Sequence, residues 1–205
     1  MKKLVLLTAA LILAASSAAF AASVLLPEPD RGGGPSVLEA IALRASAEQK
    51  NFAKDELTQE ELSTILWAAS GKNREPKGWT VPMAMGREPY VSIYVLLRKG
   101  GFLYSWEKHA LIEQSDEKRL PSGAVTQDFA KTAPCVLVFV SSGMMNMENF
   151  SYIATGAMSQ NVYLAAQALG LKARFVESFN RLKIESSLNL SPVAKITGVM
   201  LVGRQ

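Results

Sequence analysis

Cysteine and histidine are almost absent from this chain of 205 residues, which contains one of each, Cys135 and His109. A single cysteine excludes an intramolecular disulfide. Cys135 is the third residue of the apolar run 133–140 and has no histidine near it in the sequence, so we predict a small buried packing residue rather than a catalytic thiol. The same shortage of thiolate and imidazole ligands argues against a zinc site, and we predict no bound metal.

Net charge is also small. The chain has 22 Lys and Arg residues against 18 Asp and Glu residues, a formal charge of +4. Lys2 and Lys3 lie in the leader described below, and without them 20 basic and 18 acidic residues leave about +2. Such a slight excess favours neither nucleic acid nor a membrane surface as a partner.

The N-terminus has the three parts of a secretory leader. Met1-Lys2-Lys3 is a positive start, residues 4–13 are apolar, and Ala19-Phe20-Ala21 is a small-x-small cleavage site. We therefore predict a signal peptide over 1–21, cut before Ala22, and export to the periplasm or the medium. The apolar run is shorter than the roughly 20 residues that a spanning helix needs, so we expect no stable membrane anchor.

Prolines and glycines that break regular secondary structure divide the mature chain into a lead-in and a domain. Pro27-Glu28-Pro29 and Gly32-Gly33-Gly34 break regular structure, which predicts a flexible lead-in over 22–35 and one domain over 36–205. Capping-box patterns at Ser36 and Thr58 predict helices that run towards Arg44 and Gly71. In the first helix, we expect an inner face of Val37, Ile41 and Leu38.

The strands follow from alternation and from β-branched runs. Residues 91–95 alternate between apolar and polar, and with 102–104 and 110–112 they predict an antiparallel meander. The continuous run 135–140 predicts a strand buried on both faces, and 196–202 a closing strand. Helices combined with a mostly antiparallel sheet predict an α+β fold.

The segment 153–169 is uncharged and apolar nearly all round, and it ends at Gly170, which predicts a buried central helix. Gly156 and Ala157 make part of it thin enough for another backbone or a flat ligand to approach. Core packing with a homodimer seam is the alternative interpretation. Gln160 and Asn161 would need hydrogen-bond partners if they are buried.

Four separated stretches resemble the nitroreductase family. Residues 57–74, LTQEELSTILWAASGKNR, are similar to the LSLQELSxLLWAAxGxNR stretch of its SagB-like branch. Agreement continues in TVPMA (80–84), GFLY (101–104) and GAMSQN (156–161), which is followed by LGL (169–171). The resemblance spans about 36–204. It implies an α+β nitroreductase-like sandwich that forms an intertwined homodimer with FMN at the interface.

The resemblance also implies ping-pong redox chemistry. A nicotinamide, NAD(P)H, would reduce the flavin, and the flavin would then reduce a small-molecule substrate. No catalytic side chain is implied, because the flavin N5 carries the hydride and the protein binds and orients it.

The cofactor residues that the resemblance implies fall into two groups. The family's Arg-Arg-Ser-x-Arg-x-Phe motif, which holds the FMN phosphate, corresponds to residues 44–52, with a further cation near the C-terminus. The loop that faces the flavin, Pro-Ser-Ala-x-Asn-x-Gln in the family, is PMAMGRE (82–88) here, so its hydroxyl and amide are missing and Glu88 adds a carboxylate. The implied FMN-binding residues are Arg44, Ser46, Lys50, Pro82, Met83, Ala84, Gln160, Asn161, Gly170, Leu171 and Arg204.

Two hypotheses follow for function. The first is an exported FMN-dependent oxidoreductase, and the second is a flavin-free binding or structural protein on the same fold, which the depleted loop favours. A third interpretation concerns Met144, Met145 and Met147, because thioethers bind Cu(I). Such methionines more often fill irregular gaps in a core.

Overall fold

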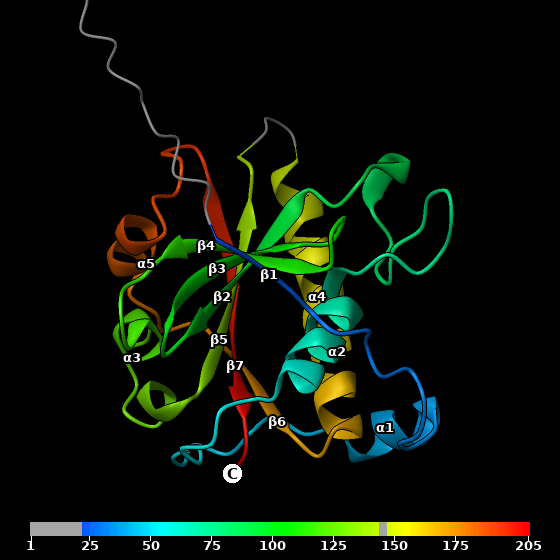
Figure 1. Cartoon of the computed structure of the whole chain (residues 1–205), viewed down its shortest axis with the longest axis horizontal. Helices are drawn as coiled ribbons and strands as arrows, with labels where there is room; N and C mark the ends of the chain where they lie inside the picture. Colours follow the sequence, from blue (N-terminus) through cyan, green and yellow to red (C-terminus); the bar gives the residue numbers. More distant parts are fainter. Residues whose placement is uncertain (1–21, 144–146) are drawn as a thin grey trace, which may run out of the picture.

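The computed structural model describes residues 22–143 and 147–205 and shows a sheet between two helical layers (Figure 1). The sheet has the order β1-β4-β3-β2-β5-β7-β6, and neighbouring strands pair antiparallel throughout. The α+β prediction with a mostly antiparallel sheet is therefore confirmed. The strands are β1 (Ser23–Leu25), β2 (Val91–Leu97), β3 (Gly100–Ser105), β4 (Ala110–Ser115), β5 (Cys135–Ser141), β6 (Lys172–Val176) and β7 (Lys195–Gly203).

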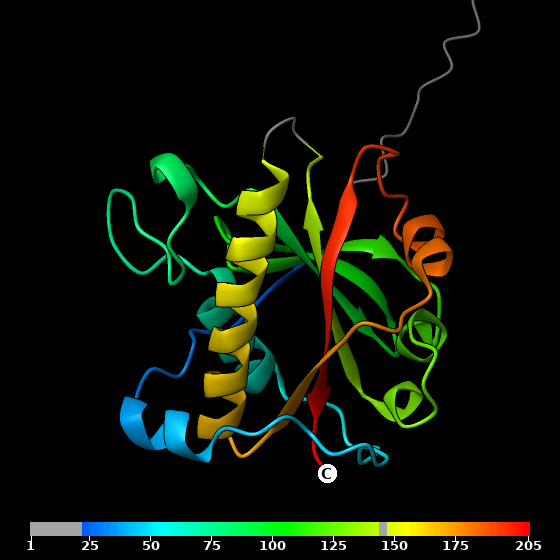
Figure 2. The same cartoon turned by 180° about the vertical axis from the view of Figure 1, so that it is seen from behind.

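The helices are segregated on the two faces of the sheet (Figures 1 and 2). α1, α2 and α4 lie on one face, and α3 and α5 on the other. Their bounds are α1 (Val37–Leu43), α2 (Gln59–Ser70), α3 (Leu120–Ala124), α4 (Glu148–Ala168) and α5 (Arg181–Ser187), with short 3-10 turns η1 (Ala84–Gly86) and η2 (Ala130–Thr132). Within the described ranges, none of the helices combines the length and the apolar character needed to cross a membrane.

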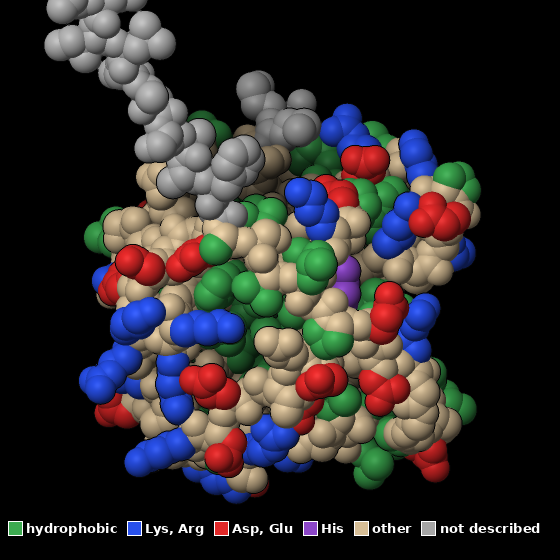
Figure 3. All heavy atoms as spheres, in the orientation of Figure 1, with side chains coloured by type: hydrophobic (Ala, Val, Ile, Leu, Met, Phe, Trp, Pro, Cys, Tyr) green, Lys and Arg blue, Asp and Glu red, His purple; other side chains and the backbone are tan. Residues whose placement is uncertain are grey.

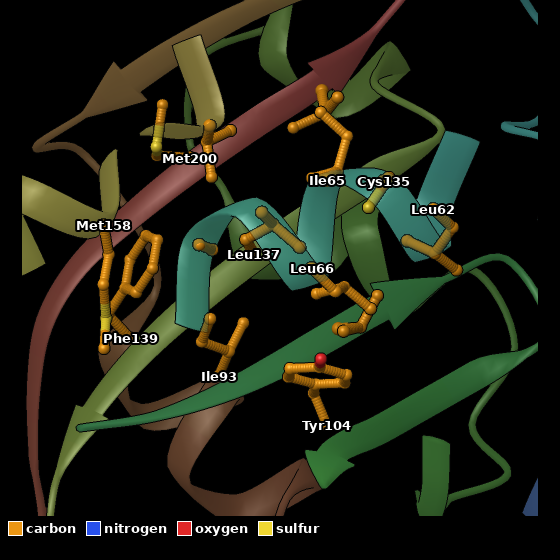
Figure 4. Close-up of a cluster of buried hydrophobic side chains, with 14 of the residues drawn as sticks. Leu62, Ile65, Leu66, Ile93, Tyr104, Cys135, Leu137, Phe139, Met158 and Met200 are labelled. Carbon is orange, nitrogen blue, oxygen red and sulfur yellow. The ribbon is translucent and has the colours of Figure 1, made fainter. Parts of the chain in front are cut away.

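Strand β5 is an interior strand of the sheet, between β2 and β7, and all seven of its residues are buried, as the β-branched run predicts. Figure 4 shows Leu137 and Phe139 meeting Met158 of α4 and Met200 of β7 on one face. Cys135 is also buried, and burial raises the pKa of its thiol to about 12. The thiol is protonated at neutral pH, which confirms the prediction of a packing residue.

Both capping boxes form, but the predicted inner face of α1 is wrong. The Ser36 and Thr58 hydroxyls accept hydrogen bonds from the N3 backbone amides, and the N3 carboxylates accept hydrogen bonds from the N-cap backbone amides. In α1 only Ala40 is buried, whereas Val37, Leu38 and Ile41 are 70%, 78% and 51% exposed. The reason is position, because this short helix lies against the C-terminal end of α4 rather than on the sheet (Figure 2).

Helix α4 begins at Glu148, five residues before the predicted start, and is buried on one side only. Ala154, Met158 and Val162 face the core. The opposite side of α4 is exposed in this single chain, as Ile153 and Gly156 are. The uncharged sequence therefore correctly predicts the helix, but not the free face along the outside of the molecule (Figure 2).

The lead-in is more ordered than its prolines and glycines suggest. Residues 23–25 form β1 against β4. The carbonyl of Pro27 accepts a hydrogen bond from the Ser63 hydroxyl at 2.5 Å and lies 3.0 Å from His109 Nε2. Asp30 N–H donates to Thr64 Oγ1. Flexibility therefore does not describe 23–30, because backbone and side-chain hydrogen bonds attach this stretch to α2 and β4.

The contacts of His109 predict a pH dependence of folding. Burial lowers its pKa, against the opposing effects of the Pro27 carbonyl and the Glu28 charge. As the pH falls below about 6.5, the imidazole of His109 therefore takes up a proton in the unfolded state before it does so in the folded state. The free energy of unfolding decreases over that pH range. His109→Gln should flatten this decrease, as measured by urea midpoints between about pH 7 and pH 5.

Carboxylates are not expected to produce this decrease, because they titrate below about pH 4.5. If the midpoints of the wild type and of His109→Gln fall in parallel over the same interval, another group is responsible.

Candidate functional site

Tyr163 of α4 connects the end of α1 to strand β6. Its hydroxyl accepts a hydrogen bond from Phe175 N–H at 2.8 Å and lies 3.1 Å from Ser46 Oγ. The Arg44 guanidinium lies over the same ring, 5.2 Å from its centroid. A backbone bond of 2.8 Å from Ala47 N–H to Ala173 O fixes the segment in place. We call Arg44, Ser46, Tyr163 and Phe175 the Tyr163 strip.

A pocket of about 380 Å³ adjoins the strip at Phe175. The space beside Gly156 is open, because a Cβ built there would meet no heavy atom within 4 Å. The volume falls in the usual range for small-molecule sites, roughly 300–1,000 Å³. The pocket is mainly apolar, and its lining includes Tyr152, Gly156, Phe175, Glu177, Phe179 and Ile196. It is therefore a candidate site for a flat ring, with a cation at one end of the strip.

Of the three cations predicted for the phosphate, Arg44 is the one that remains available. Its guanidinium has no carboxylate partner among the described residues, only the Tyr163 ring. Lys50 pairs with Glu48 at 3.1 Å on the surface. Arg204 forms an ion pair with Glu61, a carboxylate whose other oxygen caps α2 at Thr58 N–H. In this structure the Arg204 guanidinium therefore already has a carboxylate partner, and the pair attaches the C-terminus to the start of α2.

Gln160 and Asn161 have different surroundings. Gln160 is exposed on α4. The Asn161 amide donates to Ala68 O at 2.9 Å and to Thr80 O at 3.2 Å, so it holds the end of α2 to the loop that follows. The expected need of Asn161 for partners is met by the protein's own carbonyls.

The stretch Pro82 to Ala84 does not line this pocket. Ala84 N–H donates to the Tyr90 hydroxyl at 3.3 Å, and that hydroxyl donates to Phe150 O at 3.4 Å. These bonds hold the loop near the N-terminal end of α4. Within one chain, Pro82, Met83 and Ala84 are therefore separate from the Tyr163 strip.

Gly170 and Leu171 connect α4 to β6 near the strip. Gly170 has a φ of +68°, which is strained for other residues, and it ends the helix. Leu171 is 2% exposed and belongs to the core. Leu171 therefore packs in the core and is not open to a ligand. Gly170, by contrast, has open space beside its α-carbon.

Sequence reasoning missed the aromatic residues of the site, Tyr163, Phe175 and Phe179. It also missed β6, in which Lys172 and Arg174 interrupt the apolar pattern of a strand. The signal available was a tyrosine in the uncharged segment 153–169, followed by two phenylalanines just beyond that segment. Their convergence depends on contacts between residues more than 100 positions apart, such as Ser46 and Tyr163.

Metal ligation has no support from the described ranges, where no group of three or more His, Cys, Asp or Glu side chains could hold an ion. Met144 and Met145 lie outside the described residues, so the Cu(I) interpretation is not tested. Met147, at the N-cap of α4, is 5% exposed.

These features define an α+β protein with a pocket beside α4, and comparison with known proteins gives the family. The model of the nitroreductase family matches residues 41–204. A protein of Methanocaldococcus jannaschii assigned to the nitroreductases is 31% identical over 172 residues, covering 76% of this chain and 85% of the relative. The chain belongs to the nitroreductase family.

Comparison with solved structures gives the same fold. A nitroreductase-type crystal structure from Ralstonia eutropha superposes with a TM-score of 0.80 at 33% identity and covers 89% of both chains. A structure from Desulfovibrio desulfuricans, determined in complex with FMN, has a TM-score of 0.60 at 20% identity, covering 83% of this chain and 86% of that one. The second likeness shows the shared fold. The predicted nitroreductase-like sandwich is therefore confirmed.

Proposed function

We propose that this protein is an FMN-dependent oxidoreductase. The observation that carries the proposal is the placement of the Arg44 guanidinium over Tyr163, next to a pocket that is open at Gly156. Membership of the nitroreductase family and the FMN complex of a structural neighbour support it.

The residues present fit the two ends of FMN. Arg44 and the Ser46 hydroxyl supply the charge-assisted and neutral donors that a phosphate requires. The apolar pocket between Gly156 and the phenylalanines suits the ring. Glu177, a carboxylate in the pocket lining, disfavours the phosphate there and so orients it towards Arg44.

When bound, FMN supplies hydride transfer at its N5 atom. The contribution of the chain is to hold the phosphate, to orient the ring against Gly156 and to exclude water with Tyr152 and Phe179. A nicotinamide, NAD(P)H, is the proposed donor, and a small molecule is the proposed acceptor in a ping-pong cycle.

A homodimer is part of the proposal. The exposed side of α4, with Ile153 and Gly156, and the exposed apolar residues of α1 form a surface that a second copy would cover. A seam through α4 would allow the stretch 82–84 of one protomer to approach the pocket of the other. The assignment to the SagB-like branch remains a prediction from residues 57–74.

The activity is tested by reconstituting the mature chain with FMN and following NAD(P)H oxidation with a nitroaromatic or quinone acceptor. Turnover that requires both FMN and the acceptor is expected. The proposed oxidoreductase activity is refuted if the flavin-loaded protein oxidises neither NADH nor NADPH and accepts electrons from no chemical reductant. The flavin-free alternative, which the paired Arg204 and the depleted loop favour, predicts that no flavin loads at all.

Export is proposed from the order of leader features in 1–21, which lie outside the described residues. N-terminal sequencing of the protein recovered from the periplasm or the medium should begin near Ala22. Protein that accumulates only inside the cell and still begins at Met1 would contradict export.

A further inference from the structure

A second pocket, of about 460 Å³, lies on the opposite helical layer, between α3, η2 and the segment that precedes α2. Among the described residues, four cations line it, and no Asp or Glu does. The cations are Lys54, Arg98, Arg119 and Lys131, and Phe52 and Pro121 provide apolar walls. None of the residues proposed for FMN is among its lining, so this pocket is separate from the Tyr163 strip.

Hydrogen bonds between distant segments build the basic pocket. Arg98 Nη1 donates to Lys54 O at 2.8 Å, and Arg119 N–H donates to Arg98 O at 3.0 Å. Phe52 N–H donates to Thr132 Oγ1 at 2.8 Å. The turn after β2, the start of α3 and the segment 52–54 are thereby fixed to one another. The cations gather because the fold holds these backbones together.

The positive charge of the pocket is largely uncompensated. Lys131 pairs with Asp128 at 2.9 Å, but this is a surface pair. The Lys54 ammonium and the Arg119 guanidinium have no partner within residues 22–143 and 147–205. Figure 3 shows Lys and Arg side chains gathered on the side of the molecule where Figure 1 places α3. Like charges held in one concave site repel one another unless an anion binds between them.

We propose that the basic pocket binds a small multivalent anion that carries phosphate or several carboxylate groups. Guanidinium groups bind the oxygens of both anions in bidentate geometry, and lysines add point charges. The apolar walls at Phe52 and Pro121 admit a carbon skeleton attached to the anionic groups. The proposal does not depend on FMN binding, because no residue is shared between the two sites.

The test is calorimetric titration of the mature chain at low ionic strength with pyrophosphate and, separately, with citrate. The double variant Lys54→Gln/Arg119→Gln should weaken binding at least about tenfold, the loss of one or more hydrogen bonds to charged groups. Both side chains are exposed, so folding should persist, as a thermal melt will show. Lys108→Gln, an exposed lysine in the β3–β4 hairpin, is the matched control and should bind as the wild type does.

The two titrations distinguish the source of the charge. Binding of pyrophosphate but not citrate assigns a phosphate ligand, and the reverse assigns a polycarboxylate. The proposal is overturned if neither anion binds at millimolar concentration, or if the double variant binds as tightly as Lys108→Gln does.

Discussion

Arg44→Ala is expected to weaken FMN binding by roughly 1.5 to 3 kcal/mol, which is about tenfold or more in the dissociation constant. Arg44 is the predicted phosphate cation that has no carboxylate partner in the described part of the chain, whereas Lys50 and Arg204 are both paired. Charge-assisted bonds are therefore concentrated on this one side chain. Flavin fluorescence titration of the wild type and the variant measures the difference.

Riboflavin provides the internal control for this prediction, because it has the ring of FMN without the phosphate. Its affinity should be unchanged by Arg44→Ala. Lys108→Ala removes an exposed cation from the β3–β4 hairpin, outside the pocket lining, and should affect neither flavin. A loss that is equal for FMN and riboflavin would mean that Arg44 supports the fold or the ring pocket rather than the phosphate.

Gly156→Leu is expected to abolish flavin binding, to weaken the homodimer, or both. A leucine would project into the pocket and onto the exposed side of α4, where overpacking costs roughly 1 to 3 kcal/mol. In the isolated chain the same change meets no atom within 4 Å of the new Cβ. A leucine there also favours the helix over glycine by up to about 1 kcal/mol. Any loss therefore reports on a ligand or a partner.

Gly156→Ala is the matched variant for this prediction, because it gains most of the helix propensity and adds only one methyl group. Light scattering gives the mass, titration gives the FMN affinity, and urea unfolding gives the stability of each variant. If Gly156→Leu keeps the mass and the FMN affinity of Gly156→Ala, then neither the ring nor a second copy lies against this glycine.

Local patterns in the sequence predicted the parts of the fold that depend on local forces. Helix α2 was identified from its capping box at Thr58, and β5 from a β-branched run that remains buried on both faces. The free faces of α1 and α4 could not be predicted in this way. An apolar helical stripe shows that a helix will be covered, but not whether its own chain or another molecule covers it.

The site was predictable only in part. Family motifs predicted Arg44 and Ser46 as candidate phosphate-binding residues, but the contact of Ser46 with Tyr163 spans 117 positions and has no local signal. The pairing of Arg204 with Glu61 spans 143 positions. It gives a carboxylate partner to a guanidinium that the family resemblance implies as a phosphate ligand. Such pairings are properties of the folded chain, because the topology brings the two partners together.

The central claim, that this nitroreductase-family chain binds FMN through the Tyr163 strip, is tested most directly by titrating the mature protein with FMN and riboflavin and recording flavin fluorescence. The account predicts saturable FMN binding at tens of micromolar or below, with riboflavin bound at least about tenfold more weakly because it cannot engage Arg44. If neither flavin binds at tens of micromolar, the claim is contradicted, and the flavin-free protein on the same fold takes its place.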